Sequence, residues 1–154
     1  MMLRKQIRFA WKLLPSWLRL RIIRTTQQKF TVSAAAVISN GEGKVLLLNH
    51  LLRPFSGWGL PGGFLASAEQ PEEGIRREIL EETGLELDDL EMFRVRTIRR
   101  HIEILFSATA SGEARVESRE IVGLGWFGIH ELPNGLPQSQ RAVIEQVLAK
   151  GKAY

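Results

Sequence analysis

The chain has 154 residues and no cysteine, and its Lys and Arg residues outnumber its acidic residues by four. This length predicts one domain with a single core, and the lack of cysteine excludes disulfides, thiolate metal sites and thiol nucleophiles. No apolar run approaches the roughly 20 residues of a membrane-spanning helix, and basic residues interrupt the apolar runs that a signal peptide would need. We therefore expect a cytoplasmic protein.

The net positive charge of the chain comes from its N-terminal segment. The first 41 residues hold eight of the 21 Lys and Arg residues and no acid, so the rest of the chain carries 13 bases against 17 acids. The basic character therefore belongs to an N-terminal segment, and the remaining chain is mildly acidic. The eight bases are Arg4, Lys5, Arg8, Lys12, Arg19, Arg21, Arg24 and Lys29.

The basic segment shows the pattern of an amphipathic helix over residues 2–14. Pro15 interrupts this pattern, and a second helical piece is expected from Ser16 to Thr25. We assign residues 1–29 to a basic amphipathic helical extension and residues 30–154 to the main domain. The apolar face of the first helix carries Leu3, Ile7, Ala10 and Leu14, with Trp11 at its edge.

Three interpretations of this extension are open. The sequence favours packing on the domain or on a partner subunit in a homodimer, which would bury Leu3, Ile7, Phe9 and Trp11. The extension would alternatively lie on an anionic membrane, as basic amphipathic helices with tryptophan do. In the third interpretation it binds nucleic acid or a phosphate-rich ligand through charge alone, and no sequence-specific nucleic acid is expected as a partner.

The main domain begins with two predicted strands, Phe30–Ser39 and Lys44–Leu51, joined by a hairpin turn at Asn40–Gly43. After a loop and the segment Trp58–Gly63, a helix is expected to begin at Pro71, because proline suits the first helical position. Gly84 is expected to end this helix as a left-handed cap.

Strands are predicted to resume over residues 90–99, 102–110 and 121–127, and a final helix over residues 138–149. Helices and strands in this order predict an α/β sandwich with a mixed sheet.

The predicted helix at Pro71 carries Glu78, Glu81 and Glu82. Residues three and four apart lie on one face of a helix, so these carboxylates are expected to lie together and to suit Mg²⁺ or Mn²⁺. Three glutamates alone are more often a solvated acidic face, with Arg76 and Arg77 as their salt-bridge partners.

The surrounding residues change this interpretation. Residues 63–85 resemble the Nudix box, G-x5-E-x7-R-E-U-x-E-E-x-G-U with U apolar, at every fixed position. The resemblance extends over about residues 30–149 and implies a Nudix-like α/β/α sandwich that hydrolyses diphosphate bonds. The matching residues are Gly63, Glu69, Arg77, Glu78, Ile79, Glu81, Glu82, Gly84 and Leu85.

The resemblance also implies residue roles. Glu78, Glu81 and Glu82 would bind Mg²⁺, with Mn²⁺ as a substitute, and a glycine carbonyl of Gly62 or Gly63 would add a ligand. Glu69 would pair with Arg77 and hold the loop onto the helix. Glu120 would bind metal or act as the base, or it is a surface acid beside Arg119.

Residues outside the box differ between Nudix enzymes that act on different substrates. The proline expected 16 residues after the box in typical ADP-ribose enzymes is replaced by His101, and the tyrosine of dinucleoside polyphosphate enzymes is missing from residues 101–103. Gly62-Gly63 is not the Gln-Gly variant of RNA-cap hydrolases. The resemblance therefore implies a nucleoside triphosphate, or a nucleoside diphosphate linked to another moiety.

Four residues are candidates for substrate contact: Arg53, Phe55, Phe64 and Arg99. The two phenylalanines and Arg99 have ordinary alternatives, because loop aromatics also pack in cores and Arg99 would suit a solvated strand end. His50 and His101 are interpreted as structural histidines.

Two other functions compete with the hydrolysis of a nucleotide: a Nudix module that binds nucleotides without cutting them, and a membrane-surface hydrolase of lipid-linked diphosphates.

Overall fold

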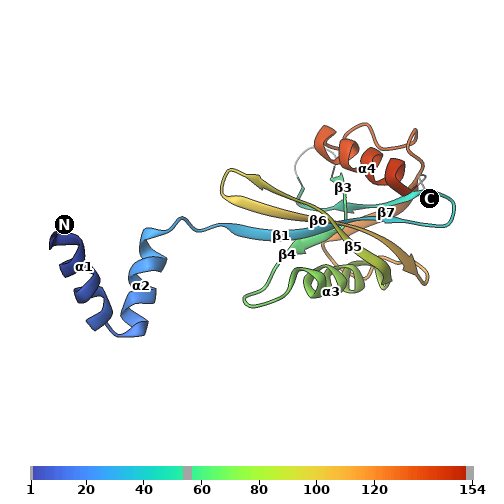
Figure 1. Ribbon diagram of the computed structural model, residues 1–154. Coiled ribbons are helices and arrows are strands. Elements are labelled where there is room, and N and C mark those ends of the chain that lie inside the picture. The colour runs from blue at the N-terminus through green and yellow to red at the C-terminus, as the bar shows by residue number, and fades with distance from the viewer. Residues whose placement is uncertain (1, 54–56, 152–154) are drawn as a thin grey trace. The chain divides into compact units, whose positions relative to one another are not determined.

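The computed structural model describes residues 2–53 and 57–151, and the chain separates into two compact units, Met1–Phe30 and Thr31–Tyr154 (Figure 1). The first unit contains two helices, α1 (Met2–Leu13) and α2 (Ser16–Thr26). Pro15 separates them, and its carbonyl accepts hydrogen bonds from the amides of Leu18 and Arg19 in the first turn of α2. None of the described helices is long and apolar enough to cross a membrane.

The second unit contains a seven-stranded mixed sheet. Its main path runs β3-β2-β1-β6-β5, while β4 pairs with β1 and β7 pairs with β2. Strands β1 and β6 are parallel, and the other pairs are antiparallel. The strands are β1 (Thr31–Ser39), β2 (Val45–His50), β3 (Trp58–Gly59), β4 (Gly62–Phe64), β5 (Glu86–Ile98), β6 (His101–Ser111) and β7 (Ile121–Phe127).

Helices cover both faces of this sheet, with α3 (Pro71–Thr83) on one face and α4 (Gln138–Gly151) on the other (Figure 1). Alternate side chains of a strand point to opposite faces. Ala36 and Ile38 of β1 therefore join a core with Ile79 of α3, while Val37 joins a second core with Ile144 of α4. The predicted α/β/α sandwich with a mixed sheet is confirmed.

Helix α3 begins and ends where the sequence predicted. Pro71 is its first residue, and the backbone amide of Gln70 lies 3.4 Å from the Glu73 carboxylate. At the other end Gly84 has a φ of 69° and donates its amide to the carbonyl of Leu80. Only glycine adopts this left-handed backbone without strain, so the helix stops there and the chain turns into β5.

One detail differs from the prediction. Strand β5 begins at Glu86, four residues before the predicted start, because residues 86–88 pair with β6 despite their acidic sequence. Asp89 then interrupts the pairing with a φ of 48° and accepts a hydrogen bond from Thr109. The segment Trp58–Gly63 forms parts of two short strands, because Pro61 lies between residues that pair with β2 and residues that pair with β1.

Candidate active site

The candidate site lies where β4 runs into the loop before α3, and two glycines permit its close packing. Gly62 has a φ of 139°, and a Cβ there would lie 2.2 Å from the carbonyl oxygen of Ala34. A Cβ on Gly63 would lie 2.3 Å from the carboxyl carbon of Glu78. The Glu78 carboxylate therefore lies directly against the Gly63 backbone, in space that any other residue would fill.

Glu69 and Arg77 join the loop to the helix. The Arg77 Nε donates to Glu69 Oε1 at 2.7 Å, its Nη2 donates to Oε2 at 3.1 Å, and the Ala66 amide also donates to Oε2 at 2.7 Å. The hydrogen bonds from Arg77 and Ala66 lower the pKa of the Glu69 carboxyl to about 2. The pair is therefore ionised at neutral pH and fixes the loop that carries Gly63.

Arg77 also contacts two of the box glutamates. Its Nη1 donates to Glu78 Oε1 at 3.0 Å and to Glu81 Oε2 at 3.2 Å. The Glu81 side chain is 60% exposed and lies on the solvent side of the helix. The structure thus places Glu78 between Arg77 and Gly63, and it places Glu81 on Arg77.

Glu82 has a different environment, since it is only 7% exposed. Its Oε1 lies 3.9 Å from His50 Nδ1, and its Oε2 is buried with no hydrogen-bond partner among the described residues. Burial raises the pKa of Glu82 to about 7, and the negative charges of Glu78 and Glu120 add to this effect. A buried carboxylate with an unpaired oxygen is costly unless something positive balances it.

The loop before β7 brings Glu120 toward this carboxylate. The amide of Glu117 donates to the Glu82 carbonyl at 3.1 Å, so the loop crosses the end of α3. At the loop's end the Leu51 amide donates to the Glu120 carbonyl at 2.8 Å, which ties it to the end of β2. The exposed Glu120 side chain makes no hydrogen bond within residues 2–53 and 57–151.

These residues fit a divalent cation. Mg²⁺ and Mn²⁺ prefer oxygen ligands, and the site offers the unpaired oxygen of Glu82, the Glu78 carboxylate and the nearby charge of Glu120. In the described part of the chain, no three acidic or histidine side chains converge as a complete metal cage. A cation that keeps several waters and shares ligands with a substrate does not require such a cage.

Beside Glu82 lies a half-buried arginine, Arg53, whose Nη2 donates to the Leu60 carbonyl at 3.0 Å. Its Nη1 is buried without a partner among the described residues. A Cβ on Gly59 would lie 1.7 Å from that nitrogen, so the glycine leaves room for the guanidinium. Arg53, Glu82, Gly59 and Leu60 thus form a cluster that Gln140 of α4 joins, since its side-chain oxygen accepts a hydrogen bond from the Leu60 amide at 3.0 Å.

His50 belongs to the same cluster. Burial, together with the charge of Arg53, lowers the pKa of His50 to about 4, so the imidazole is neutral at neutral pH. The sequence analysis did not connect His50 with Glu82, nor Gly59 and Gln140 with Arg53. No local pattern links them, because the Leu60–Gln140 hydrogen bond spans 80 residues.

Phe64 follows Gly63 in β4, but its side chain is 64% exposed and meets the ring of His101 edge-on. Arg99 lies in the β5–β6 turn with a φ of 56°. His101 bridges the hydroxyls of Thr31 and Ser33 at 2.8 and 2.9 Å and so joins β6 to β1. Phe55 lies outside the described residues.

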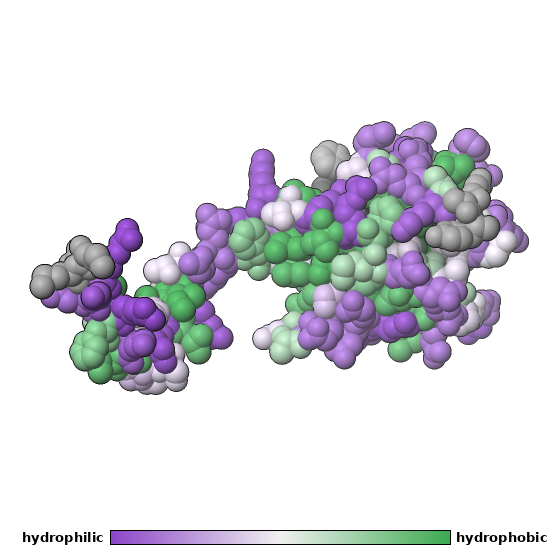
Figure 2. Space-filling model, in the orientation of Figure 1, coloured by the Kyte–Doolittle hydropathy of each residue, from purple (hydrophilic) through white to green (hydrophobic). Residues whose placement is uncertain are grey.

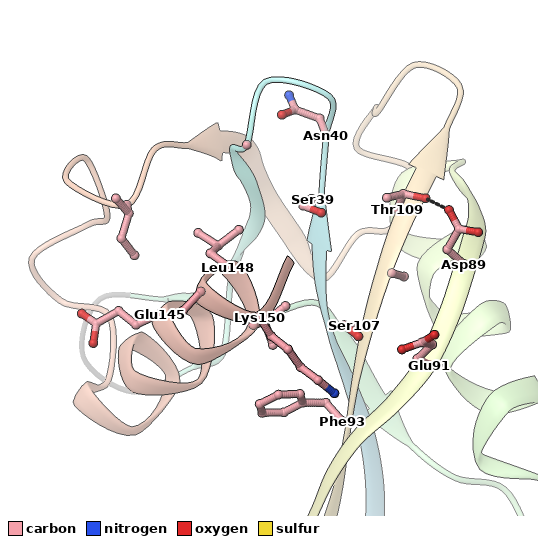
Figure 3. A pocket seen from close by; sticks show the side chains of 15 residues that line it. Ser39, Asn40, Asp89, Glu91, Phe93, Ser107, Thr109, Glu145, Leu148 and Lys150 are labelled. Carbon is pink, nitrogen blue, oxygen red and sulfur yellow. Dashed lines mark hydrogen bonds between the residues drawn. The ribbon is translucent and has the colours of Figure 1, made fainter. Parts of the chain in front are cut away.

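A separate cavity of about 810 Å³ lies on the α4 side of the sheet (Figure 3). Phe93, Glu91 and Lys150 line it, and the Lys150 amine lies 6.0 Å from the centre of the Phe93 ring. None of the candidate site residues lines this cavity.

Similarity to known proteins identifies the family of the chain. A family model described as the NUDIX domain matches residues 29–147, most of the chain. The chain therefore belongs to the Nudix family of hydrolases, whose members generally use divalent metals.

Two relatives of the chain cover similar ranges. It is 34% identical over 106 residues to a MutT-like protein of Streptomyces ambofaciens, with 67% of each chain covered. It is 29% identical over 107 residues to a putative 8-oxo-dGTP diphosphatase of Bacillus subtilis, covering 68% of this chain and 70% of the relative.

The fold also matches solved structures. The structure of a MutT NUDIX hydrolase from Burkholderia pseudomallei aligns with a TM-score of 0.69 and 32% identity. The alignment covers 78% of this chain and 99% of that one.

Proposed function

We propose that the protein is a magnesium-dependent pyrophosphohydrolase that acts in the cytoplasm. Its substrate would be a nucleoside triphosphate or a nucleoside diphosphate linked to another moiety. The observation that carries this proposal is Glu82, a buried carboxylate with an unpaired oxygen beside Glu78. A buried carboxylate without a positive partner is costly in a protein interior. A cation bound beside Glu82 would therefore explain its unpaired oxygen.

Glu78 and Glu82 would hold Mg²⁺, or Mn²⁺ in its place, with Glu81 and the Gly63 carbonyl as further ligands. When bound, the metal neutralises charge on the diphosphate and lowers the pKa of a water molecule. Glu69 and Arg77 hold the loop in place, so that the Gly63 backbone stays against Glu78.

The protein's own groups would carry the remaining steps. Arg53 would add positive charge beside Glu82 that favours the phosphates of the substrate, while Leu60 holds its Nη2 in place. Glu120 would accept the proton of the attacking water, because Arg77 already occupies the Glu78 carboxylate. Water adds to phosphorus as the bridging P–O bond breaks, and the two phosphate products separate.

The names of the relatives support the substrate class without fixing its identity. They include a putative 8-oxo-dGTP diphosphatase and, at 30% identity over 113 residues, an NAD-capped RNA hydrolase of Vibrio cholerae. This chain covers 42% of the latter's length. A nucleotide carrying a diphosphate is common to both names, and it is the class that we propose.

Glu82→Gln tests the site. We expect a fall in kcat of at least about a hundredfold at saturating magnesium. The substitution removes a negative charge that binds the metal, and with it several kcal/mol of transition-state stabilisation. Glu81→Gln is expected to show a loss of the same order. The measurement is chromatographic separation of the products from nucleoside triphosphates and nucleotide conjugates.

Glu72→Gln is the matched control, since Glu72 lies exposed in the first turn of the same helix. It should retain activity within about twofold, as surface changes usually do. Equal rates in wild type, Glu82→Gln and Glu81→Gln would reject the site. If wild type binds the nucleoside triphosphates and nucleotide conjugates but hydrolyses none of them, the protein is a non-catalytic Nudix module.

A further inference from the structure

The N-terminal unit carries the most uneven charge of the molecule. All eight of its Lys and Arg residues lie within residues 4–29, which hold no acid. Within the described residues, none of these eight bases forms an ion pair. The unit therefore presents an unneutralised positive surface.

The charge is segregated in α1. At the ~100° that separates successive helical residues, the four bases of α1 fall within an arc of about 100°. Ile7, Phe9 and Leu13 lie outside this arc, and their side chains are 60%, 66% and 69% exposed. An apolar surface thus runs beside a basic one along the whole helix.

The unit does not bury these side chains itself. Trp11 and Leu14 are half-buried, whereas Trp17, Leu20 and Ile23 of α2 are 63%, 52% and 44% exposed. No residue of α2 is buried. Figure 2 shows hydrophobic and hydrophilic side chains next to one another on the surface of this unit. Short helices are only marginally stable in water, so α1 and α2 need an apolar partner from outside the unit.

We propose that the N-terminal unit docks on an anionic lipid surface. The apolar side chains of α1 and α2 would enter the boundary between headgroups and acyl chains, and the bases would contact acidic headgroups. Trp11 and Trp17 suit this boundary, because indole has an apolar body and a polar N–H. The inference stands apart from the proposed reaction and concerns where the hydrolase acts.

Charge argues against a second copy of the N-terminal unit as the partner. Two copies of the unit would repel, since neither contains an acid. The exposed apolar residues of β5, Met92, Val95 and Ile98, lie on a strand with four acids and two arginines, so they lack the uniform positive charge that accompanies the apolar residues of α1. An anionic membrane offers both the missing negative charge and the missing apolar phase.

Vesicle sedimentation of the full chain tests the proposal. The vesicles are phosphatidylcholine alone or phosphatidylcholine mixed with phosphatidylglycerol. We expect at least tenfold tighter binding to the anionic vesicles, a loss of at least tenfold at high salt, and a blue shift of tryptophan fluorescence on binding.

Two variants separate the apolar and the charged contributions. The apolar variant is a triple substitution of α1, and it should weaken binding at least tenfold: Ile7→Gln, Phe9→Gln and Leu13→Gln. Its matched control is a triple substitution of β5 that should bind like wild type: Met92→Gln, Val95→Gln and Ile98→Gln. The charge variant, Arg4→Glu with Arg8→Glu, should also weaken binding at least tenfold, whereas its control, Lys44→Glu with Arg115→Glu, should bind like wild type. All variants should keep the wild-type hydrolysis rate and unfolding temperature, which excludes misfolding as the cause.

Wild type that fails to bind anionic vesicles, or an α1 triple variant that binds as wild type does, would overturn the proposal. A dimer that dissociates in the triple variant, without vesicle binding, would overturn it in favour of a second copy of the chain. Salt-sensitive binding to duplex DNA in place of vesicles would overturn it in favour of a nucleic acid.

Discussion

At the scale of single residues, burial controls the charges of the candidate site. It raises the pKa of Glu82 to about 7 and lowers that of His50 to about 4. Both shifts favour the uncharged form, because the interior solvates charge poorly. At a pH between about 4 and 7, both side chains are therefore neutral, and the contact of 3.9 Å between His50 Nδ1 and Glu82 Oε1 is not an ion pair. A bound cation would restore the charge of Glu82.

The pH dependence of stability tests this balance. A carboxyl whose folded pKa is raised stabilises the fold below its ordinary value of 4.5, and this contribution is lost as the pH rises through about 7. In EDTA, the unfolding free energy of wild type relative to Glu82→Gln should therefore fall between pH 4.5 and 7 and then level off.

Urea denaturation of both proteins across this range provides the measurement. His50 has a lowered pKa, so its contribution is present above its ordinary value of 6.5 and is lost as the pH falls toward 4. Both proteins contain His50, so this opposing change cancels in the comparison. Parallel stability curves for the two proteins would show that burial does not raise the pKa of Glu82.

At the scale of elements, the loop between β4 and α3 depends on one carboxylate. Glu69 accepts three hydrogen bonds, two from Arg77 and one from the Ala66 amide. Its pKa of about 2 means that this connection is present above pH 4.5 and is lost as the pH falls toward 2. The loop is thus attached to the helix at every physiological pH.

Glu69→Gln should loosen this loop without unfolding the domain. Glutamine keeps one acceptor but loses the charge that binds both nitrogens of Arg77. We expect faster amide hydrogen exchange in residues 64–70 and a lower kcat, because the Gly63 backbone is no longer fixed against Glu78. Mass spectrometry reports the exchange, with the exposed Glu86→Gln as the control. Unchanged exchange in this segment would show that the loop is held by other contacts.

At the scale of the whole molecule, the chain contains two units that differ in kind. Residues 31–151 bury two apolar cores on either side of a sheet, whereas the described residues of the N-terminal unit include none that is buried. Residues 27–30 connect them outside regular structure and are exposed. We propose that the hydrolase domain begins at this connection and folds without the extension.

Limited trypsin digestion tests this division. We expect cleavage after Lys29 to leave a resistant fragment that begins at Phe30 and keeps the unfolding temperature and hydrolysis rate of the full chain. The reason is that the cores of the second unit contain no residue of the first. Thermal unfolding and nucleotide hydrolysis of the purified fragment are the measurements. A fragment that aggregates or unfolds at lower temperature would show that the extension is part of the domain.

The sequence by itself determined the elements whose causes are local. Proline at the first position of α3, the left-handed glycine that ends it and the hairpin turn at Asn40–Gly43 all act within a few residues. The resemblance to the Nudix box likewise implied the pairing of Glu69 with Arg77, and the loop and helix that carry them are adjacent in the chain.

Only the tertiary structure decided how the box carboxylates differ. Glu81 and Glu82 are neighbours in sequence, yet about 100° of helical rotation turns Glu81 toward solvent and Glu82 toward the sheet. The neighbours of Glu82 are then set by strand pairing and burial, which bring His50 and Arg53 beside it. Such contacts depend on how distant segments pack together, and no local pattern of residues records them.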